Sequence, residues 1–482
     1  RRGQWIALDS VGQPVGDHGS FVASRVVFGD IAPTDEMLAS PPGGCLFYDA
    51  LVAIDQEMID DKSVYRAIES VTGTAPDVRV FNLSFDTQPL PLMDPTRRRE
   101  NLLLVQDLDN LIFRDDIIVV ISAGNSPRNT PPAIDYPRHY DDPNWQLGAW
   151  ARSFNSLTCG SFVGRLTPGG LVAALGWPSP FTRVGPGTCD SPKPDFSESG
   201  GNGSPSWRYA AGLGVSGLSA AGFWEDRVGT SFAAPVLARE AAFAIQALQK
   251  ACLPGARPYA VTTKAFLILT ATPHAVTGTA KTLAFRALGR GRASASRLKA
   301  PLPSTAVLIW QGLLEAPREI ARVTIPIPRA WYEQATAPHL RLVAAWDSPV
   351  NAAVSGLWAT RKVSAQLKAS PDSPALHGSR GDHHSYPVID RTYDLRRLPK
   401  DVSVSGDTWL LELSYDQIAD YHAGMVFTPQ QRLGVALELF HASEDGVGPQ
   451  SALQTLPVAD TMVRLSISPQ PIKVPVLVRP IS

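Results

Sequence analysis

The sequence predicts an α/β domain, with a parallel sheet flanked by helices, followed by an all-β domain that forms a sandwich or jelly roll. Buried apolar runs alternate with helical patterns over the first 300 residues. Past about residue 302, short alternating runs separated by Pro and Gly take their place. The chain has 482 residues, which is enough for two or three domains. We therefore expect a first domain over residues 1–300 and a second over residues 301–482.

The first half of the first domain alternates strands with helices. Apolar helical patterns cover residues 18–28, about 60–71 and 99–113. The continuous apolar runs typical of strands covered on both faces are Cys45–Ile54, Val78–Phe85 and Ile117–Ile121. This order implies right-handed crossovers and a parallel sheet. Ligands of such sheets bind beyond the carboxyl ends of the strands.

The later segments carry weaker signals. Residues 135–222 are loop-rich, with an exposed turn expected at Gly200–Ser206, and helices are expected from Ser231 to about Lys250 and near Lys264–Thr272. In the second domain Ser370–Tyr386 is polar, so we expect an exposed loop there. Strands of the second domain are predicted at Arg322–Ile327, Leu340–Trp346, Val354–Ala359, Thr408–Ser414, Leu433–Phe440 and Met462–Ile467.

Composition narrows the classes of function. The formal net charge is −1, which gives no reason to expect a nucleic-acid partner or an acidic membrane surface. The four cysteines are scattered without a CxxC pair, so free thiols are expected and no metal framework. No apolar run approaches the length of a membrane span. The chain starts Arg1-Arg2-Gly3 without Met, so we expect a fragment or a processed product.

Three short motifs carry the chemistry. They are Asp17–Ala23 (DHGSFVA), Ser122–Asn125 (SAGN) and Gly229–Pro235 (GTSFAAP). The third places a serine between a glycine turn and an alanine-rich helix, where the helix field favours a nucleophile. Each motif alone has an ordinary structural explanation, since Ser commonly caps a helix and His commonly starts one. Their occurrence together in one order is far more specific.

The three motifs resemble those of the subtilisin-like serine peptidases, the subtilases. The resemblance implies His18 as the general base, Asn125 as a side-chain donor to the oxyanion hole and Ser231 as the nucleophile. It covers roughly the first 300 residues and implies a subtilisin-like sheet, a serine endopeptidase and no required cofactor. Many subtilases bind calcium, but no acidic loop here identifies a metal site.

Within the subtilases, the sequence most resembles bacterial, intracellular members with an appended β-domain. These enzymes are often encoded beside an AAA+ ATPase, so an ATPase partner and a cytoplasmic location are expected. A protein or peptide is the expected substrate. The segment Asn82–Asp86 resembles the subtilase strand that pairs with an extended substrate. The expected walls of the primary pocket are Ser84, Phe85 and Asp86 on one side, and Ser122, Ala123 and Gly124 on the other.

An acid at Asp86 would favour a basic side chain before the cut, whereas the alternative is a strand-end residue facing water. The pair His383-His384 resembles a metal site, but a solvated loop is the better interpretation. We expect His139 to be structural or solvent-facing.

The carboxylate that should complete the triad is the gap in this assignment. Subtilases order their triad Asp, His, Ser, and only 17 residues precede His18 here. Asp9 is a candidate because it follows a strand-like run, and an acid upstream of Arg1 is the other. Asp17 is better explained as a helix N-cap. The alternative function is a catalytically impaired subtilase-fold scaffold or binding module that lacks the triad acid.

Overall fold

The computed structural model forms two compact units, each of which is described by itself. The first unit is Arg1–Ala242 with Ala271–Ala293, and the second is Phe243–Thr270 with Ser294–Ser482. The described residues are 4–7, 17–30, 47–51, 61–85, 87–126, 135–205, 212–251, 256–276, 281–295, 305–327, 337–353, 358–380, 387–396, 408–421, 427–441 and 462–464.

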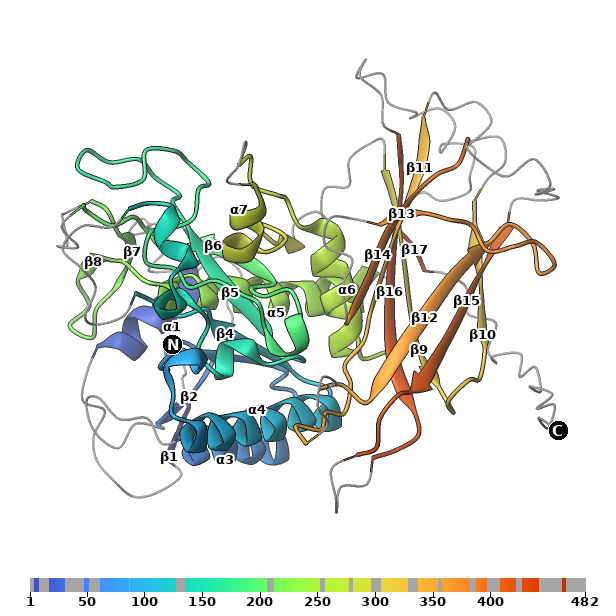
Figure 1. Ribbon diagram of the computed structural model, residues 1–482, viewed down its shortest axis with the longest axis horizontal. Helices are drawn as coiled ribbons and strands as arrows, with labels where there is room; N and C mark the ends of the chain where they lie inside the picture. The colour runs from blue at the N-terminus through green and yellow to red at the C-terminus, as the bar shows by residue number, and fades with distance from the viewer. Residues whose placement is uncertain are drawn as a thin grey trace. The chain divides into compact units, whose positions relative to one another are not determined.

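A parallel sheet forms the centre of the first unit, as predicted (Figure 1). Its strand order is β3-β4-β5-β6, and every neighbouring pair is parallel. The four strands are β3 (Val80–Leu83), β4 (Ile118–Ser122), β5 (Leu157–Phe162) and β6 (Phe196–Ser199). The fully buried β4 is the apolar run that the sequence marked as a strand covered on both faces.

Helices cover this sheet. The helices α3 (Asp61–Thr74) and α4 (Pro95–Asp115) lie side by side in Figure 1. Apolar residues of both, such as Ile68 and Leu108, share a core with Val119 of β4. The helix α7 (Lys281–Leu288) contacts β5 and β6. The remaining elements of this unit are β1 (Gln4–Ala7), α1 (His18–Phe28), β2 (Tyr48–Leu51), β7 (Val215–Leu218), β8 (Trp224–Arg227), and the start of α5 (Ala234–Ala251).

The strands β1 and β2 form a parallel pair, and β7 and β8 form an antiparallel hairpin. Short 3-10 helices occupy Leu90–Leu92 (η1), Arg138–Asp141 (η2), Pro143–Trp145 (η3), Trp150–Arg152 (η4), Thr188–Asp190 (η5) and Thr230–Phe232 (η6).

The turn after β6 is buried, so the exposed turn expected at Gly200–Ser206 is wrong over residues 200–204. A Cβ at Gly200 would lie 2.3 Å from the Ser161 Oγ, so glycine is needed there for close packing rather than for a surface bend. The Asn202 side chain accepts from the Val172 N–H at 3.2 Å and donates to the Val172 carbonyl at 2.8 Å. These bonds satisfy the amide inside the unit.

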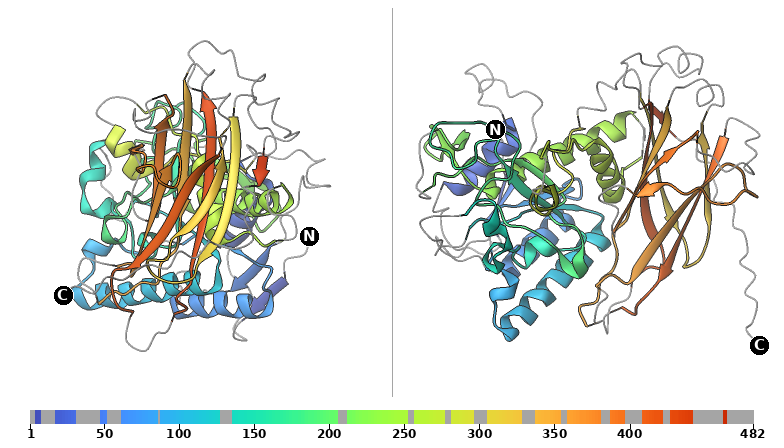
Figure 2. Two further views of the ribbon diagram at one scale, coloured as in Figure 1. Left: turned by 90° about the vertical axis from the view of Figure 1, so that its right-hand side faces the viewer. Right: turned by 45° about the horizontal axis from the view of Figure 1, so that its top comes forward.

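The second unit is a β-sandwich with one helix on its larger sheet (Figure 2). The sheets have the orders β10-β15-β12 and β13-β14-β11-β16-β9-β17. Residues of both sheets, including Trp409 and Leu437, form one apolar core. The strands are β9 (Thr305–Leu314), β10 (Ala321–Pro326), β11 (Pro338–Ala345), β12 (Arg361–Lys368), β13 (Ser379–Arg380), β14 (Val388–Asp394), β15 (Thr408–Gln417), β16 (Gln431–His441) and β17 (Met462–Arg464).

The helix α6 (Ala260–Thr270) packs against β16, β11 and β9. The sequence assigned this helix to residues 1–300, whereas contacts group it with the sandwich. Among the residues that the structure describes, no helix combines the length and the apolar content that crossing a membrane requires.

Candidate active site

The helix α1 begins at His18, which presents an exposed imidazole at the end of the helix. Its Nε2 lies 3.1 Å from the carbonyl oxygen of Ser84. A carbonyl only accepts, so Nε2 carries a proton in this arrangement. The ring centroid of His18 lies 5.4 Å from that of Phe232. The imidazole therefore lies between the end of strand β3 and the turn that contains Ser231.

Asp17 occupies the N-cap position of α1, but its side chain makes no capping bond. Its carboxylate instead receives two hydrogen bonds from Arg227 at the end of β8, the one from Nη1 being 2.8 Å long. The hydrogen bond from Arg227 is the main cause that lowers the pKa of Asp17. The expected cap is thus correct in position and wrong in contact. The pair ties the start of α1 to the strand that leads to Ser231.

Ser231 is the middle residue of η6, which begins directly after Gly229 and precedes α5. Gly229 has a φ of 152°, in the region that favours glycine. Ser231 is 6% exposed, and its carbonyl oxygen accepts from the Ser84 Oγ at 2.8 Å. Ser84 thus contacts His18 through its carbonyl and Ser231 through its hydroxyl. One residue of the predicted substrate strand joins the two residues.

Asn125 follows β4 at the carboxyl end of the sheet. Its Oδ1 accepts from the Thr230 backbone N–H at 2.9 Å and from the Thr230 hydroxyl at 3.1 Å. The Gly124 N–H donates to the same Thr230 hydroxyl at 3.1 Å. These bonds fix the amide plane beside the turn of Ser231. A Cβ added at Gly229 would lie 3.6 Å from the Asn125 Nδ2, which places the donor end of the amide next to that glycine.

The two predicted walls lie at the carboxyl ends of the neighbouring strands β3 and β4, in which Leu83 pairs with Ile121. The Ser122 hydroxyl donates to the Phe85 carbonyl at 3.0 Å, which links the two walls directly. Ala123 is buried, and its N–H donates to the Cys159 carbonyl at 2.9 Å. Two predicted site residues, Asp9 and Asp86, lie outside the described residues.

Several polar residues that support the site were not predicted from the sequence. Arg183 donates from Nε to the Asn125 carbonyl at 2.7 Å, and from Nη1 to the Thr87 carbonyl. Thr230 orients Asn125, and Arg25 donates from Nε to the Phe232 carbonyl at 3.1 Å. A signal for Arg25 exists in the sequence, because residues seven apart in a helix lie on the same face and Arg25 is seven after His18.

The described residues contain no cluster of His, Cys, Asp and Glu that could hold a metal ion, and the pair His383-His384 lies outside them. His139 is half-buried, with Nε2 2.9 Å from the Pro180 carbonyl. Burial lowers its pKa to about 4, so it is neutral near pH 7. His139 packs in an aromatic cluster with Tyr140 and Trp145, which agrees with a structural residue.

Comparison with known proteins places this site in context. The profile of peptidase S8, the subtilase family, matches residues 7–291, which is more than half of the chain. No curated protein matches the chain.

Three solved structures that are similar to this chain are proteases. The prenylagaramide maturation protease PagA is 18% identical, with 61% of this chain and 84% of that chain covered at a TM-score of 0.40. A lanthipeptide protease is 17% identical, with 60% and 75% covered at a TM-score of 0.42. The epidermin leader peptide processing serine protease EpiP from Staphylococcus aureus is 16% identical, with 58% and 62% covered at a TM-score of 0.40.

Proposed function

Because the chain belongs to the subtilase family, we propose that it is a serine endopeptidase that cuts peptide bonds through an acyl-enzyme. Ser231 is the nucleophile, His18 the general base and Asn125 a donor to the oxyanion. The observation that carries the proposal is Ser84, which contacts both His18 and Ser231. Ser84 bonds the backbone of Ser231 and the His18 ring, and an imidazole within reach of a serine hydroxyl makes that hydroxyl nucleophilic.

The first half of the reaction forms the acyl-enzyme. The Ser231 Oγ attacks the carbonyl carbon of the substrate while His18 accepts the hydroxyl proton. Negative charge develops on the carbonyl oxygen, where the Asn125 amide and the Ser231 N–H donate to it. The C–N bond then breaks, and His18 returns the proton to the leaving amine. In the second half, water attacks the ester while His18 accepts its proton, and the acid product leaves as the proton returns to the Ser231 Oγ.

The ring orientation of His18 decides when this chemistry starts. With Nε2 bonded to the Ser84 carbonyl, the proton is on the nitrogen that must accept one. A carboxylate at Nδ1 holds the other tautomer and leaves a lone pair on Nε2. In that tautomer Nε2 has no proton to donate to the Ser84 carbonyl, so we expect the ring to turn its Nε2 toward Ser231. We propose Asp9, or an acid upstream of Arg1, as this carboxylate.

The substrate is proposed to be an extended peptide. It would add to the strand at residues 82–86 and to residues 122–124, with backbone hydrogen bonds supplying affinity. Asp86 would favour Lys or Arg before the cut, and cleavage of a peptide library without that preference contradicts this part. We also propose a bacterial cytoplasmic enzyme with an AAA+ ATPase as partner. A pull-down from the native cells that recovers no ATPase contradicts the partner.

Labelling with a fluorophosphonate tests the catalytic proposal. The probe modifies a serine only when that serine is activated, so the wild-type protein should be labelled once per chain at Ser231. Ser231→Ala should abolish labelling, whereas Ser204→Ala, a change of another buried serine in the same unit, should not. A folded wild-type protein that takes no label would instead favour the catalytically impaired scaffold.

A further inference from the structure

Arg25 lies on the side of α1 that faces the proposed nucleophile, and it is almost fully buried, at 1% exposure. We propose that Arg25 is a positioning residue that sets the separation between His18 and Ser231. This inference rests on the proposed function. The argument starts from the face of the helix: His18, Phe21 and Arg25 are spaced by three and four residues, so they lie on one face. Phe21 packs on Phe232, with ring centroids 4.5 Å apart.

The guanidinium of Arg25 has acceptors in four different segments. Nε donates to the Phe232 carbonyl at 3.1 Å, which is the residue after Ser231. Nη2 donates to the Ser199 carbonyl at 3.2 Å and to the Asp30 carboxylate at 2.8 Å. Nη1 donates to the Ser216 carbonyl at 3.4 Å. One side chain therefore joins α1 to η6, β6, β7 and Asp30, the second residue after the helix.

The chemistry of arginine suits this task. A guanidinium is planar and rigid, so its donors fix several acceptors at once in a set geometry. Burying a charge costs free energy, and an apolar side chain of similar volume is often as good for stability. Stability alone thus gives little reason for an arginine here. The bond to the Phe232 carbonyl gives a reason, because it holds the turn that contains the Ser231 hydroxyl.

Two other arginines hold the two ends of the same helix. Arg239 of α5 donates from Nη1 to the carbonyls of Val26 at 3.1 Å and Val27 at 2.6 Å, near the end of α1. Arg227 pairs with Asp17 at its start. Both ends of α1 are therefore anchored by other side chains, and Arg25 bonds the segment Thr230–Phe232 through the Phe232 carbonyl. Loss of Arg25 should leave the helix in place and loosen its distance to Ser231.

The consequence is a defect in the chemical step. A small misplacement of catalytic groups lowers the rate by up to about 100-fold, even when substrate binding is intact. We expect Arg25→Met to lower the maximal inactivation rate by a fluorophosphonate about 10- to 100-fold. The probe concentration at half-maximal rate should stay within about two-fold, because the residues at 82–86 and 122–124 are unchanged. Arg25→Lys keeps the charge but not the fork, so we expect an intermediate rate.

The matched control is Arg79→Met. Arg79 is also buried and also bonds a carboxylate, with Nη2 2.6 Å from the Asp116 Oδ2. It lies before β3, at the end of that strand opposite to Ser84. Arg79→Met should lower the melting temperature and leave the inactivation rate unchanged. All rates are measured on the full chain and normalised to the folded fraction from circular dichroism.

The outcomes separate this inference from the proposed function. Wild-type labelling with unchanged rates in Arg25→Met and Arg25→Lys overturns the positioning role and leaves the peptidase intact. Equal losses in Arg25→Met and Arg79→Met overturn it as well, since a general loss of order would explain both. If Arg25→Met does not fold, Arg25→Lys decides by the same criteria. A wild-type protein that takes no label overturns both proposals.

Discussion

The carboxyl group of Glu198 has no exposed surface and lies on β6, the last strand in the order of the parallel sheet of the first unit. Its Oε2 lies 3.0 Å from the Arg292 Nε. Burial raises its pKa from an ordinary 4.5 to about 8, and outweighs the opposing effect of Arg292. The folded protein therefore holds this proton to about pH 8, while the unfolded chain releases it near pH 4.5. The stability that this group contributes is complete below pH 4.5 and is lost as the pH rises through 8.

Replacing Glu198 with Gln should remove that dependence, because an amide stays neutral. We expect the melting temperatures of Glu198→Gln and wild type to be close at pH 5. At pH 8.5 the variant should melt higher, by on the order of 5 °C. Differential scanning calorimetry at both values measures the gap. Glu100→Gln on the exposed face of α4 is the control. Its difference in melting temperature from the wild type should be the same at both pH values. A gap for Glu198→Gln that is the same at both pH values contradicts the prediction.

At the scale of residues, the sequence could nominate His18, Asn125 and Ser231 because each lies within two residues of a glycine. An apolar run precedes Asn125, and apolar helical patterns follow His18 and Ser231. Their catalytic roles stay predictions. The contacts between them could not be predicted from the sequence. The Ser84 carbonyl and the Thr230 hydroxyl make these contacts with residues that are distant in the chain. The partners of Arg25 were equally hidden, since an arginine within an apolar helix does not reveal which carbonyls it meets.

At the scale of elements, the predictions succeeded where an apolar run was continuous. The helix α1 and the strand β4 begin and end within one residue of their predicted bounds. The strands β5 and β6 were missed, although both are fully buried. Their sequences, LTCGSF and FSES, are small and polar, and local pattern cannot show that they lie inside. A buried hydroxyl there is satisfied by a hydrogen bond that the sequence does not reveal, as in the Ser161 hydroxyl 2.7 Å from that of Ser179.

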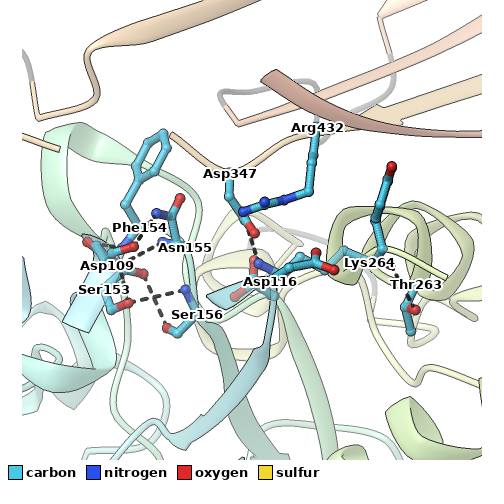
Figure 3. A network of polar contacts seen from close by, with 12 residues as sticks. Asp109, Asp116, Ser153, Phe154, Asn155, Ser156, Thr263, Lys264, Asp347 and Arg432 are labelled. Carbon is cyan, nitrogen blue, oxygen red and sulfur yellow. Dashed lines mark hydrogen bonds and ion pairs between the residues drawn. The ribbon is translucent and has the colours of Figure 1, made fainter. Parts of the chain in front are cut away.

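Helix α4 is joined to the segment before β5 by a buried carboxylate (Figure 3). Asp109 Oδ1 accepts from the Ser153 hydroxyl at 2.5 Å and from the Asn155 N–H at 2.8 Å. Its Oδ2 accepts from the Phe154 N–H at 3.0 Å. Asp109 has no exposed surface, so these donors have no access to water. One side chain of α4 thus accepts a hydrogen bond from each residue of the segment Ser153–Asn155.

Removal of this carboxylate should be costly. Asp109→Ala leaves three donors buried without their acceptor, so we expect a loss of about 3 kcal/mol or more in the free energy of unfolding. Asp94→Ala is the matched change on the same helix. Asp94 is an exposed N-cap that accepts from Thr96 and Arg97, and its loss should cost about 1 kcal/mol. Urea unfolding followed by fluorescence compares the two. Equal losses would show that the buried carboxylate contributes no more than a surface cap.

At the scale of the whole molecule, contacts group helix α6 with the β-sandwich. The change from helical to strand patterns in the sequence, near residue 302, lies after this helix. All eleven residues of α6 are buried. A Cβ at Gly434 of β16 would lie 2.4 Å from the Thr262 Cα, so the helix backbone rests directly on the sheet. Lys264 donates from Nζ to the Asp347 carboxylate at 2.5 Å, and this pair inside the second unit is drawn in Figure 3. A helix whose residues are all buried needs such contacts with the elements around it.

The domain boundary expected at residue 300 can therefore be tested by truncation. A chain that ends at residue 300 keeps α6 but loses β9, β11 and β16, the strands that α6 contacts. Exposed apolar surface then replaces the packed face, and Lys264 loses the carboxylate that compensates its burial. We expect this chain to bind the dye ANS and to melt at least about 5 °C below the full chain. A chain that ends at residue 441 keeps all three strands and should melt near the full chain. A chain of residues 1–300 that melts with the full chain and binds no ANS would show that α6 folds without the sandwich.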